Sequence, residues 1–270
     1  MGPDSPRFLR GGQLETIVTE DQAPGSQPLE RPEELRAPNG TAEADRNAWL
    51  RAVVGIVTSP KSSFDLIRKH QPWLGASLLL LAASTVQFLL ALRGLASSPA
   101  FEGIVEVLPN AEALVLATGV IFAVIGLVIG WLFQALVVWL LAVALTSNAT
   151  FGRSFSLTVH VAVISCLAGF VGLLLSMGAS LESLESPTDV AEAMVVPGLN
   201  LLLTTDNAVL NTIYSSITPF SIWHLILLGL GAAAVFEMSP RKGLLIVGIY
   251  WAGTTAFAAA AAGVAGVLSS

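Results

Sequence analysis

Residues 113–145 read ALVLATGVIFAVIGLVIGWLFQALVVWLLAVAL, a run of 33 positions without a charged side chain. As a helix this run is about 50 Å long at 1.5 Å per residue, whereas roughly 20 apolar residues cross a bilayer core of about 30 Å. Two spans and a turn would need a longer run, and this one contains no proline and no turn dipeptide. We therefore predict a single tilted helix that extends beyond the membrane.

Four further stretches lack charged residues and are long enough to cross a membrane as helices. They are Trp73–Leu92, Ser154–Met177, Phe220–Phe236 and Gly243–Leu268. The chain as a whole is 54% hydrophobic and 12% charged, about half the charged fraction of a soluble domain. The sequence predicts an all-α fold, a polytopic membrane helical bundle with five transmembrane helices in a membrane domain over residues 73–270.

A sixth crossing over residues 193–218 is rejected. It would place Asp206 near the bilayer centre, at a cost of about 2.5–3.5 kcal/mol. The same stretch contains Pro197-Gly198 and several uncharged polar residues. We expect an extramembrane or interfacial loop with some amphipathic helix. The sequence also shows no pair of interrupted spans, the pattern that marks a carrier site.

The distribution of Lys and Arg predicts the orientation of the bundle, because cytoplasmic loops are enriched in these residues. One set of loops carries eight of them: Arg46, Arg51, Lys61, Arg68, Lys69, Arg153, Arg241 and Lys242. The opposite loops carry only Arg93, together with eight acidic residues. We predict a multi-pass protein of a prokaryotic plasma membrane, with its N-terminus in the cytoplasm and its C-terminus outside.

Residues 1–45 differ in composition from the rest of the chain. They contain six prolines, five glycines, nine acidic and four basic residues, and no apolar periodicity. Such a segment cannot bury enough apolar surface to offset the entropy of ordering it. We predict a disordered cytoplasmic tail.

Residues 46–72 are expected to form juxtamembrane amphipathic helices. A helical stripe is predicted from Trp49, Leu50, Val53, Val54, Ile56 and Val57. Ser59-Pro60 then marks the start of a second helix. From residue 46 to 70 the formal charge is five basic minus one acidic, or +4. The segment is interpreted either as a collar on the membrane surface or as a partner-docking surface, with candidate contacts Arg46, Arg51, Lys61, Arg68 and Lys69.

Four polar side chains inside the spans are candidates for function: Gln87, Gln134, His160 and His224. Counted along the spans, the two histidines fall in opposite halves of the membrane and cannot share one metal ion. We interpret all four as interhelical polar contacts, the usual role of sparse polar residues in membrane helices. We expect no catalytic residue, metal or cofactor, because the nucleotide, hydrolase and metalloprotease motifs are absent from the sequence.

Small residues at a spacing of four predict close contacts between helices. The pairs are Gly126/Gly130, Gly172/Ser176, Gly248/Ala252 and Ala259/Gly263. We attribute them to packing within one bundle rather than to dimerisation, although the sequence leaves self-association open.

Three stretches resemble the Yip family, whose name refers to interaction with Ypt/Rab GTPases, and specifically its prokaryotic branch. They are WLRAVVGIVTSP at 49–60 with Pro72-Trp73, the long second span with Phe151, Arg153 and Phe155 after it, and TPFSIWHLILLGLG at 218–231 with SPRKG at 239–243. The resemblance covers residues 46–268. It implies five spans and a cytosolic N-terminus. For eukaryotic members it implies vesicle traffic through small GTPases and membrane shaping, and it carries over no catalytic residues.

Together these features predict a non-enzymatic integral membrane protein that acts by partner binding or membrane organisation. Its expected contacts are the lipid bilayer and a protein at the cytoplasmic face, and no nucleic acid. The alternative is a small-molecule permease, or an accessory subunit of a transporter, with a path lined by Gln87, Gln134, His160 and His224.

Overall fold

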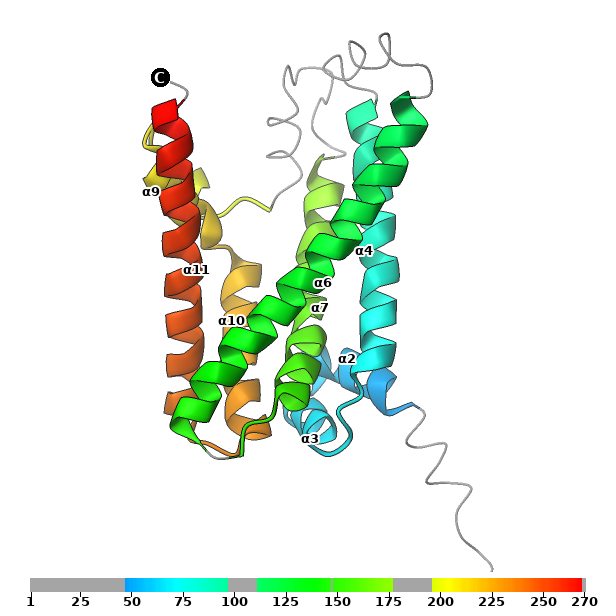
Figure 1. Ribbon diagram of the computed structural model, residues 1–270, viewed down its shortest axis with the longest axis vertical. Coiled ribbons are helices and arrows are strands. Elements are labelled where there is room, and N and C mark those ends of the chain that lie inside the picture. The colour runs from blue at the N-terminus through cyan, green and yellow to red at the C-terminus, as the bar shows by residue number, and fades with distance from the viewer. Residues whose placement is uncertain (1–46, 97–110, 147, 177–195, 269–270) are drawn as a thin grey trace, which may run out of the picture. The chain divides into compact units, whose positions relative to one another are not determined.

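The computed structural model describes residues 47–96, 111–146, 148–176 and 196–268, which belong to one compact unit over residues 39–270. The predicted tail and Arg46 lie outside the described residues. The described part is helical and contains no strand, so the predicted all-α membrane bundle is confirmed. Five long helices alternate in direction (Figure 1): α4 Trp73–Ala96, α6 Ala111–Leu145, α7 Phe151–Ser176, α10 Pro219–Val235 and α11 Pro240–Leu268.

Helix α6 is continuous and inclined to its neighbours (Figure 1), as its length predicted. Far from its C-terminus it packs on α4, where a Cβ at Gly119 would lie 3.2 Å from the Phe88 ring. At its C-terminus it meets α11, where Lys242 Nζ donates to the carbonyl of Leu145 over 3.2 Å. Helix α6 therefore crosses the bundle, and α6 and α11 diverge with distance from this contact.

Among the described residues, four helices are long and apolar enough to cross a membrane alone, and a bent pair of helices reaches the same length and hydropathy when taken as one span. Helix α9 (Ala208–Ser216) and α10 meet at an angle of 61°. Pro219 opens α10, and Thr218 and Ser221 exchange side-chain to backbone hydrogen bonds of 2.8 and 2.9 Å in a capping box. We predicted no interrupted pair of spans; the structure contains one interrupted span, because this cap starts a new helix inside the crossing.

The rejection of a sixth crossing agrees with the short elements found there. Within 196–218 the structure places only the 3-10 turn η3 (Leu199–Leu201) and α9, each too short to cross alone. Helix α9 is capped by Asn207, whose side chain accepts from the amides of Val209 and Leu210. It packs beside α11. It thereby continues the α10 crossing at an angle.

Helices α2 (Ala48–Thr58) and α3 (Pro60–His70) form a hairpin at one end of the bundle, which we call the collar. Its inner side belongs to the main core, where Phe64 faces Gly231 of α10 and Leu157 of α7. A Cβ at Gly231 would lie 2.5 Å from Leu157 Cδ1 and 2.8 Å from the Phe64 ring. The glycine is therefore what lets α3 approach α10 so closely.

The predicted stripe of α2 is only partly correct. Val53 and Ile56 are buried as expected, but Leu50, Val54 and Val57 are 44%, 56% and 39% exposed. The buried side is completed instead by Ala48, Ala52 and Gly55. Small side chains let the backbone of α2 lie close to the bundle. They therefore occupy the inner face of the helix, and three larger apolar residues lie on its outer face.

Several predicted small-residue contacts are absent from the described bundle. An added Cβ at Gly126, Gly130 or Gly248 would meet nothing within 4 Å. The closest approach occurs instead between α10 and α11, where a Cβ at Gly243 would collide with the carbonyl oxygen of Gly229. Gly172 and Ser176 are buried on α7, and Ala259 is buried on α11.

Candidate functional site

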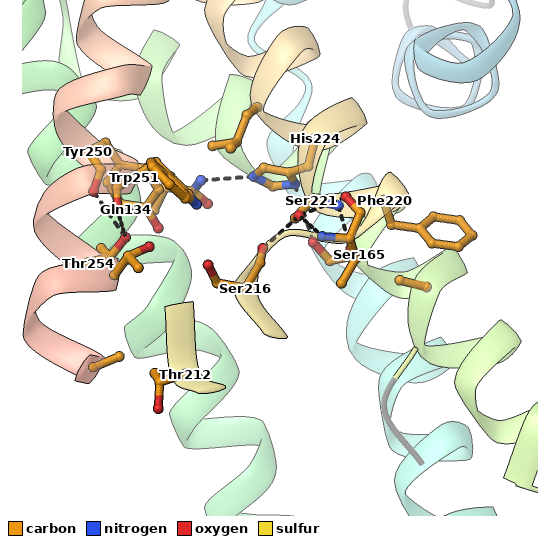
Figure 2. A pocket seen from close by; sticks show the side chains of 15 residues that line it. Gln134, Ser165, Thr212, Ser216, Phe220, Ser221, His224, Tyr250, Trp251 and Thr254 are labelled. Atoms are coloured by element: carbon orange, nitrogen blue, oxygen red, sulfur yellow. Dashed lines mark hydrogen bonds between the residues drawn. The ribbon is translucent and has the colours of Figure 1, made fainter. Parts of the chain in front are cut away.

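A polar cluster lies near the middle of the bundle, where Gln134 of α6, His224 of α10 and Ser165 of α7 meet (Figure 2). Gln134 Nε2 lies 3.0 Å from His224 Nε2, and Ser165 Oγ lies 3.3 Å from His224 Nδ1. Gln134 is 7% exposed although its side chain is polar. The cluster therefore ties α10 to the two consecutive helices α6 and α7.

Both ring nitrogens of His224 are engaged. Nε2 faces the side-chain amide of Gln134, and Nδ1 faces Ser165 Oγ, with the carbonyl of Val161, one turn before Ser165, as a further partner of the ring. A neutral imidazole has one donor and one acceptor nitrogen, and the tautomer decides which is which. The ring bridges α6 and α7 in either tautomer.

His224 lies deeper than its place in the sequence suggested. Counting from Phe220 placed it about 6 Å inside the membrane, but α9 continues the crossing beyond that point. Its partner Gln134 is 11 residues from the end of α6 at Leu145, or about 16 Å along the helix. The imidazole is therefore in the central part of the bundle.

Two cavities meet at this cluster, and both are lined by Gln134, Ser165, His224 and Tyr250. The first, of about 490 Å³, extends along α9, α10 and α11 past Thr212, Ser216 and Thr254. The second, of about 440 Å³, extends between α4, α6 and α7 past Ser84, Gln87 and Gly130. Among the described residues that line the two cavities, none is charged.

The structure brings together three of the four polar residues singled out in the spans. Gln134 and His224 are in contact, and Gln87 lines the second cavity while its Nε2 donates to the carbonyl of Cys166 over 2.6 Å. His160 is separate: it is fully buried, and its Nδ1 lies 2.7 Å from the carbonyl of Ser156, a contact within α7 rather than the predicted contact between helices. Within the described ranges no group of three or more His, Cys, Asp and Glu side chains has metal-site geometry.

Other cavity residues were not singled out from the sequence. Ser165 contacts His224, and Tyr250, Trp251 and Thr254 of α11 face the first cavity (Figure 2). A signal existed in α11, because Tyr250 and Thr254 are four residues apart and share one face of a helix that is largely apolar after Lys242. For Ser165 there was none, since single serines are common in membrane helices.

The described basic residues that were predicted as contacts lie on the collar and differ in their exposure and ion pairing. Lys61 and Lys69 are exposed on α3, and Arg51 is exposed on α2. Arg68 is held between two carboxylates, at 3.4 Å from Asp65 and 3.5 Å from Glu237. The Glu237 contact joins α3 to the turn between α10 and α11.

The remaining basic residues of the predicted cytoplasmic set lie at the same end as the collar. Arg153 is near the start of α7 and donates to the carbonyl of Asn148. Arg241 and Lys242 open α11. Lys242 donates to the last carbonyl of α6, and a cation at this position is stabilised by the negative end of the helix dipole. The end of the bundle that carries the collar is therefore its basic end.

An apolar groove of about 430 Å³ lies beside the contact between α3 and α10. Its walls are formed by Phe64, Leu230, Ala233 and Met238, and Lys61 lies at its edge. The collar therefore carries both apolar surface, including the exposed Leu50, Val54 and Val57 of α2, and exposed basic side chains.

The spanning helices, the collar and the uncharged interior cavities define a polytopic α-helical membrane protein. The sequence model of the Yip1 domain matches residues 54–262, so the chain belongs to the Yip1 domain family, and the resemblance noted in the sequence is confirmed. A curated relative is the membrane protein YknW of Bacillus subtilis (strain 168), which is 26% identical over 198 residues, or 71% of this chain and 81% of that protein. No solved structure matches the chain.

Proposed function

We propose that this protein is a non-enzymatic membrane organiser that acts through the collar on the cytoplasmic leaflet. The observation that carries the proposal is the outer surface of α2, where Leu50, Val54 and Val57 are exposed at i, i+4 and i+7. A short helix with such a stripe lies in the membrane interface, with its apolar side among the acyl chains. Because its other side is fixed in the bundle core, the collar adds volume to one leaflet.

The orientation follows from charge. The described Lys and Arg side chains near the collar are Arg51, Lys61, Arg68, Lys69, Arg153, Arg241 and Lys242, against two acidic ones, Asp65 and Glu237. Cytoplasmic segments carry such an excess of basic residues. We assign the collar to the cytoplasm and the C-terminus of α11 to the outside of a prokaryotic plasma membrane.

The basic surface of the collar suits anionic lipid as a partner. Lys61 and Lys69 are exposed, and a basic side chain near an anionic leaflet contributes about 1 kcal/mol of attraction. Arg68 contributes less, because Asp65 and Glu237 already neutralise it. An acidic protein surface is the competing partner, and the experiment below separates it from lipid.

The test compares the charge reversal Lys61→Glu/Lys69→Glu with the charge-conserving control Lys61→Arg/Lys69→Arg. Full-length protein is reconstituted in nanodiscs of neutral lipid with a minority of anionic lipid, and the lipid retained on extraction is measured by native mass spectrometry. We expect the reversal to lose anionic lipid and the control to keep it. Equal retention by both variants would contradict the lipid proposal. A protein crosslinked in cells only to the wild type and the control would then favour docking.

An intramembrane hydrolase is an enzymatic alternative that the geometry raises, because Ser165 and His224 are 3.3 Å apart. A catalytic base that activates a serine is itself oriented by a third group, commonly a carboxylate. Here the second ring nitrogen is engaged by Gln134, and none of the described residues lining the two cavities is a carboxylate. The absence of such a third group among these residues supports a non-enzymatic role. A fluorophosphonate probe is expected to leave Ser165 unlabelled.

A further inference from the structure

The two interior cavities have no part in the collar function and carry an inference of their own. They meet at Gln134 and His224 and extend from the centre of the bundle towards the end opposite the collar. Their existence follows from the fold. Helix α6 touches α11 near Lys242 and diverges from it, while the break before Thr218 turns α9 away from the axis of α10. The space left between α6, α10 and α11 is lined by apolar side chains together with hydroxyl and amide groups.

Polar groups inside the bundle favour a polar occupant, because hydrocarbon cannot meet the hydrogen-bonding capacity that they have left. A volume of about 490 Å³ has room for several water molecules. It also falls within the range of small-molecule sites, roughly 300–1,000 Å³.

The side chains in the first cavity indicate the class of ligand. None of the described lining residues is charged, so the site offers no counter-charge to an ion. It does offer a carboxamide, hydroxyl groups and an aromatic wall, from Gln134, Ser165, Ser216, Tyr250, Trp251 and Thr254. The hydroxyls of Thr212, Ser216 and Thr254 donate to carbonyls of their own helices, so their oxygens are left to accept from hydroxyl groups on a ligand. The aromatic rings of the cavity can pack against a flat apolar face of the same ligand.

We infer that the cavity around Gln134 and His224 binds an uncharged molecule with several hydroxyl groups, of the size and shape of a sugar ring. Such a ring exists as a free solute outside the cell or as the headgroup of a glycolipid. The first source would enter past Thr212 and Ser216 at the α9 end. The second would enter from the bilayer beside Gly130, where α6 is open. The chemistry of the site is the same for both sources.

The first step tests whether the cavity is open to water. The chain contains one cysteine, Cys166, so Cys166→Ala gives a thiol-free background. Into it we place Thr254→Cys, inside the cavity, and as a matched control Phe257→Cys, which is on the same helix but 79% exposed on the outer surface of the bundle. A small charged methanethiosulfonate reagent is added to the folded full-length protein in nanodiscs. We expect rapid labelling of Thr254→Cys and slow labelling of Phe257→Cys. Labelling of Thr254→Cys only after denaturation would overturn the inference.

The second step tests the ligand class by protection of Thr254→Cys. Methyl glucoside represents the free sugar, glucosyl diacylglycerol in the nanodisc represents the lipid source, and glucose 6-phosphate is the charged control. Protection by methyl glucoside assigns a free solute, and protection by the glycolipid alone assigns a headgroup. Either result supports the site. Protection by neither, or equal protection by glucose 6-phosphate, would refute it.

The third step ties the ligand to the cluster. In the Thr254→Cys background, Gln134→Leu is expected to weaken protection about fivefold, as for one lost hydrogen bond between neutral groups. Phe133→Leu is the matched control, because it is the next residue of α6 and its side chain is exposed on the outer surface of the bundle. If Gln134→Leu does not insert, Ser165→Ala carries the same expectation with a smaller change in volume. Unchanged protection in whichever of the two variants inserts would show that the cluster does not hold the ligand.

Discussion

The attachment of the collar to the bundle can be tested at Gly231. In Gly231→Ala the new Cβ would lie 2.5 Å from Leu157 Cδ1 and 2.8 Å from the Phe64 ring, so both side chains must move. Overpacking of this kind costs about 1–3 kcal/mol. Gly248→Ala is the matched control, because an added Cβ there meets nothing within 4 Å and the same gain in helix propensity, about 1 kcal/mol, applies to both variants. The difference between them therefore isolates packing.

The assay is thermal unfolding of the full-length protein in detergent, followed by circular dichroism. A difference of 1–3 kcal/mol corresponds to a Tm lower by about 2–12 °C for Gly231→Ala than for Gly248→Ala, at about 2–4 °C per kcal/mol for a chain of this size. Phe64→Leu in the Gly231→Ala background removes ring atoms from the contact and should recover part of the loss. Equal Tm values for the two alanine variants would refute the close approach of α3 to α10, and with it the fixed position of the collar.

Three further predictions concern topology, the tail and the histidines. Reporter fusions after Leu145 and after Ser270 are expected to lie in the cytoplasm and outside, respectively; periplasmic activity at Leu145 would contradict the orientation. Deletion of residues 1–45 is expected to leave membrane yield and thermal stability nearly unchanged, and a large loss of either would show that the tail packs on the bundle. His160→Asn and His224→Asn are each expected to cost about 1 kcal/mol or less in detergent unfolding. Stoichiometric zinc that either variant loses would show a metal site instead.

The membrane bundle was predictable because it depends on length and charge alone. A charge-free run of 33 residues from Ala113 to Leu145 has one way to satisfy its backbone in lipid, a helix, and its excess length requires tilt. The basic residues before α4, α7 and α11 were predictable as one set, because two crossings separate each of these segments from the next and an even number of crossings returns the chain to the same end.

Contacts between helices were harder to predict, because sequence spacing defines a face but not its neighbour. Gly126 and Gly130 have the spacing of a contact motif, yet their side of α6 is open, because the tilt of α6 carries it away from the adjacent helix. Gly229 and Gly243 lie on separate helices and have no common spacing, yet their backbones touch. The collar shows the same limit. The sequence predicted an apolar stripe on α2, but its buried face includes Ala48, Ala52 and Gly55.

The polar cluster depends on a combination of two features that the sequence showed only separately. Excess length in α6 implied tilt, and Thr218-Pro219 implied a helix start, but neither alone predicts a cavity. Together they separate α6 from α11 and bend α9 away from α10, and the space falls where Gln134 and His224 face each other. Had α9 and α10 formed one straight helix, His224 would keep the same neighbours on α10 but lose the open wall beside Thr212 and Ser216. The break, rather than the histidine, is therefore what gives the bundle a place for a polar ligand.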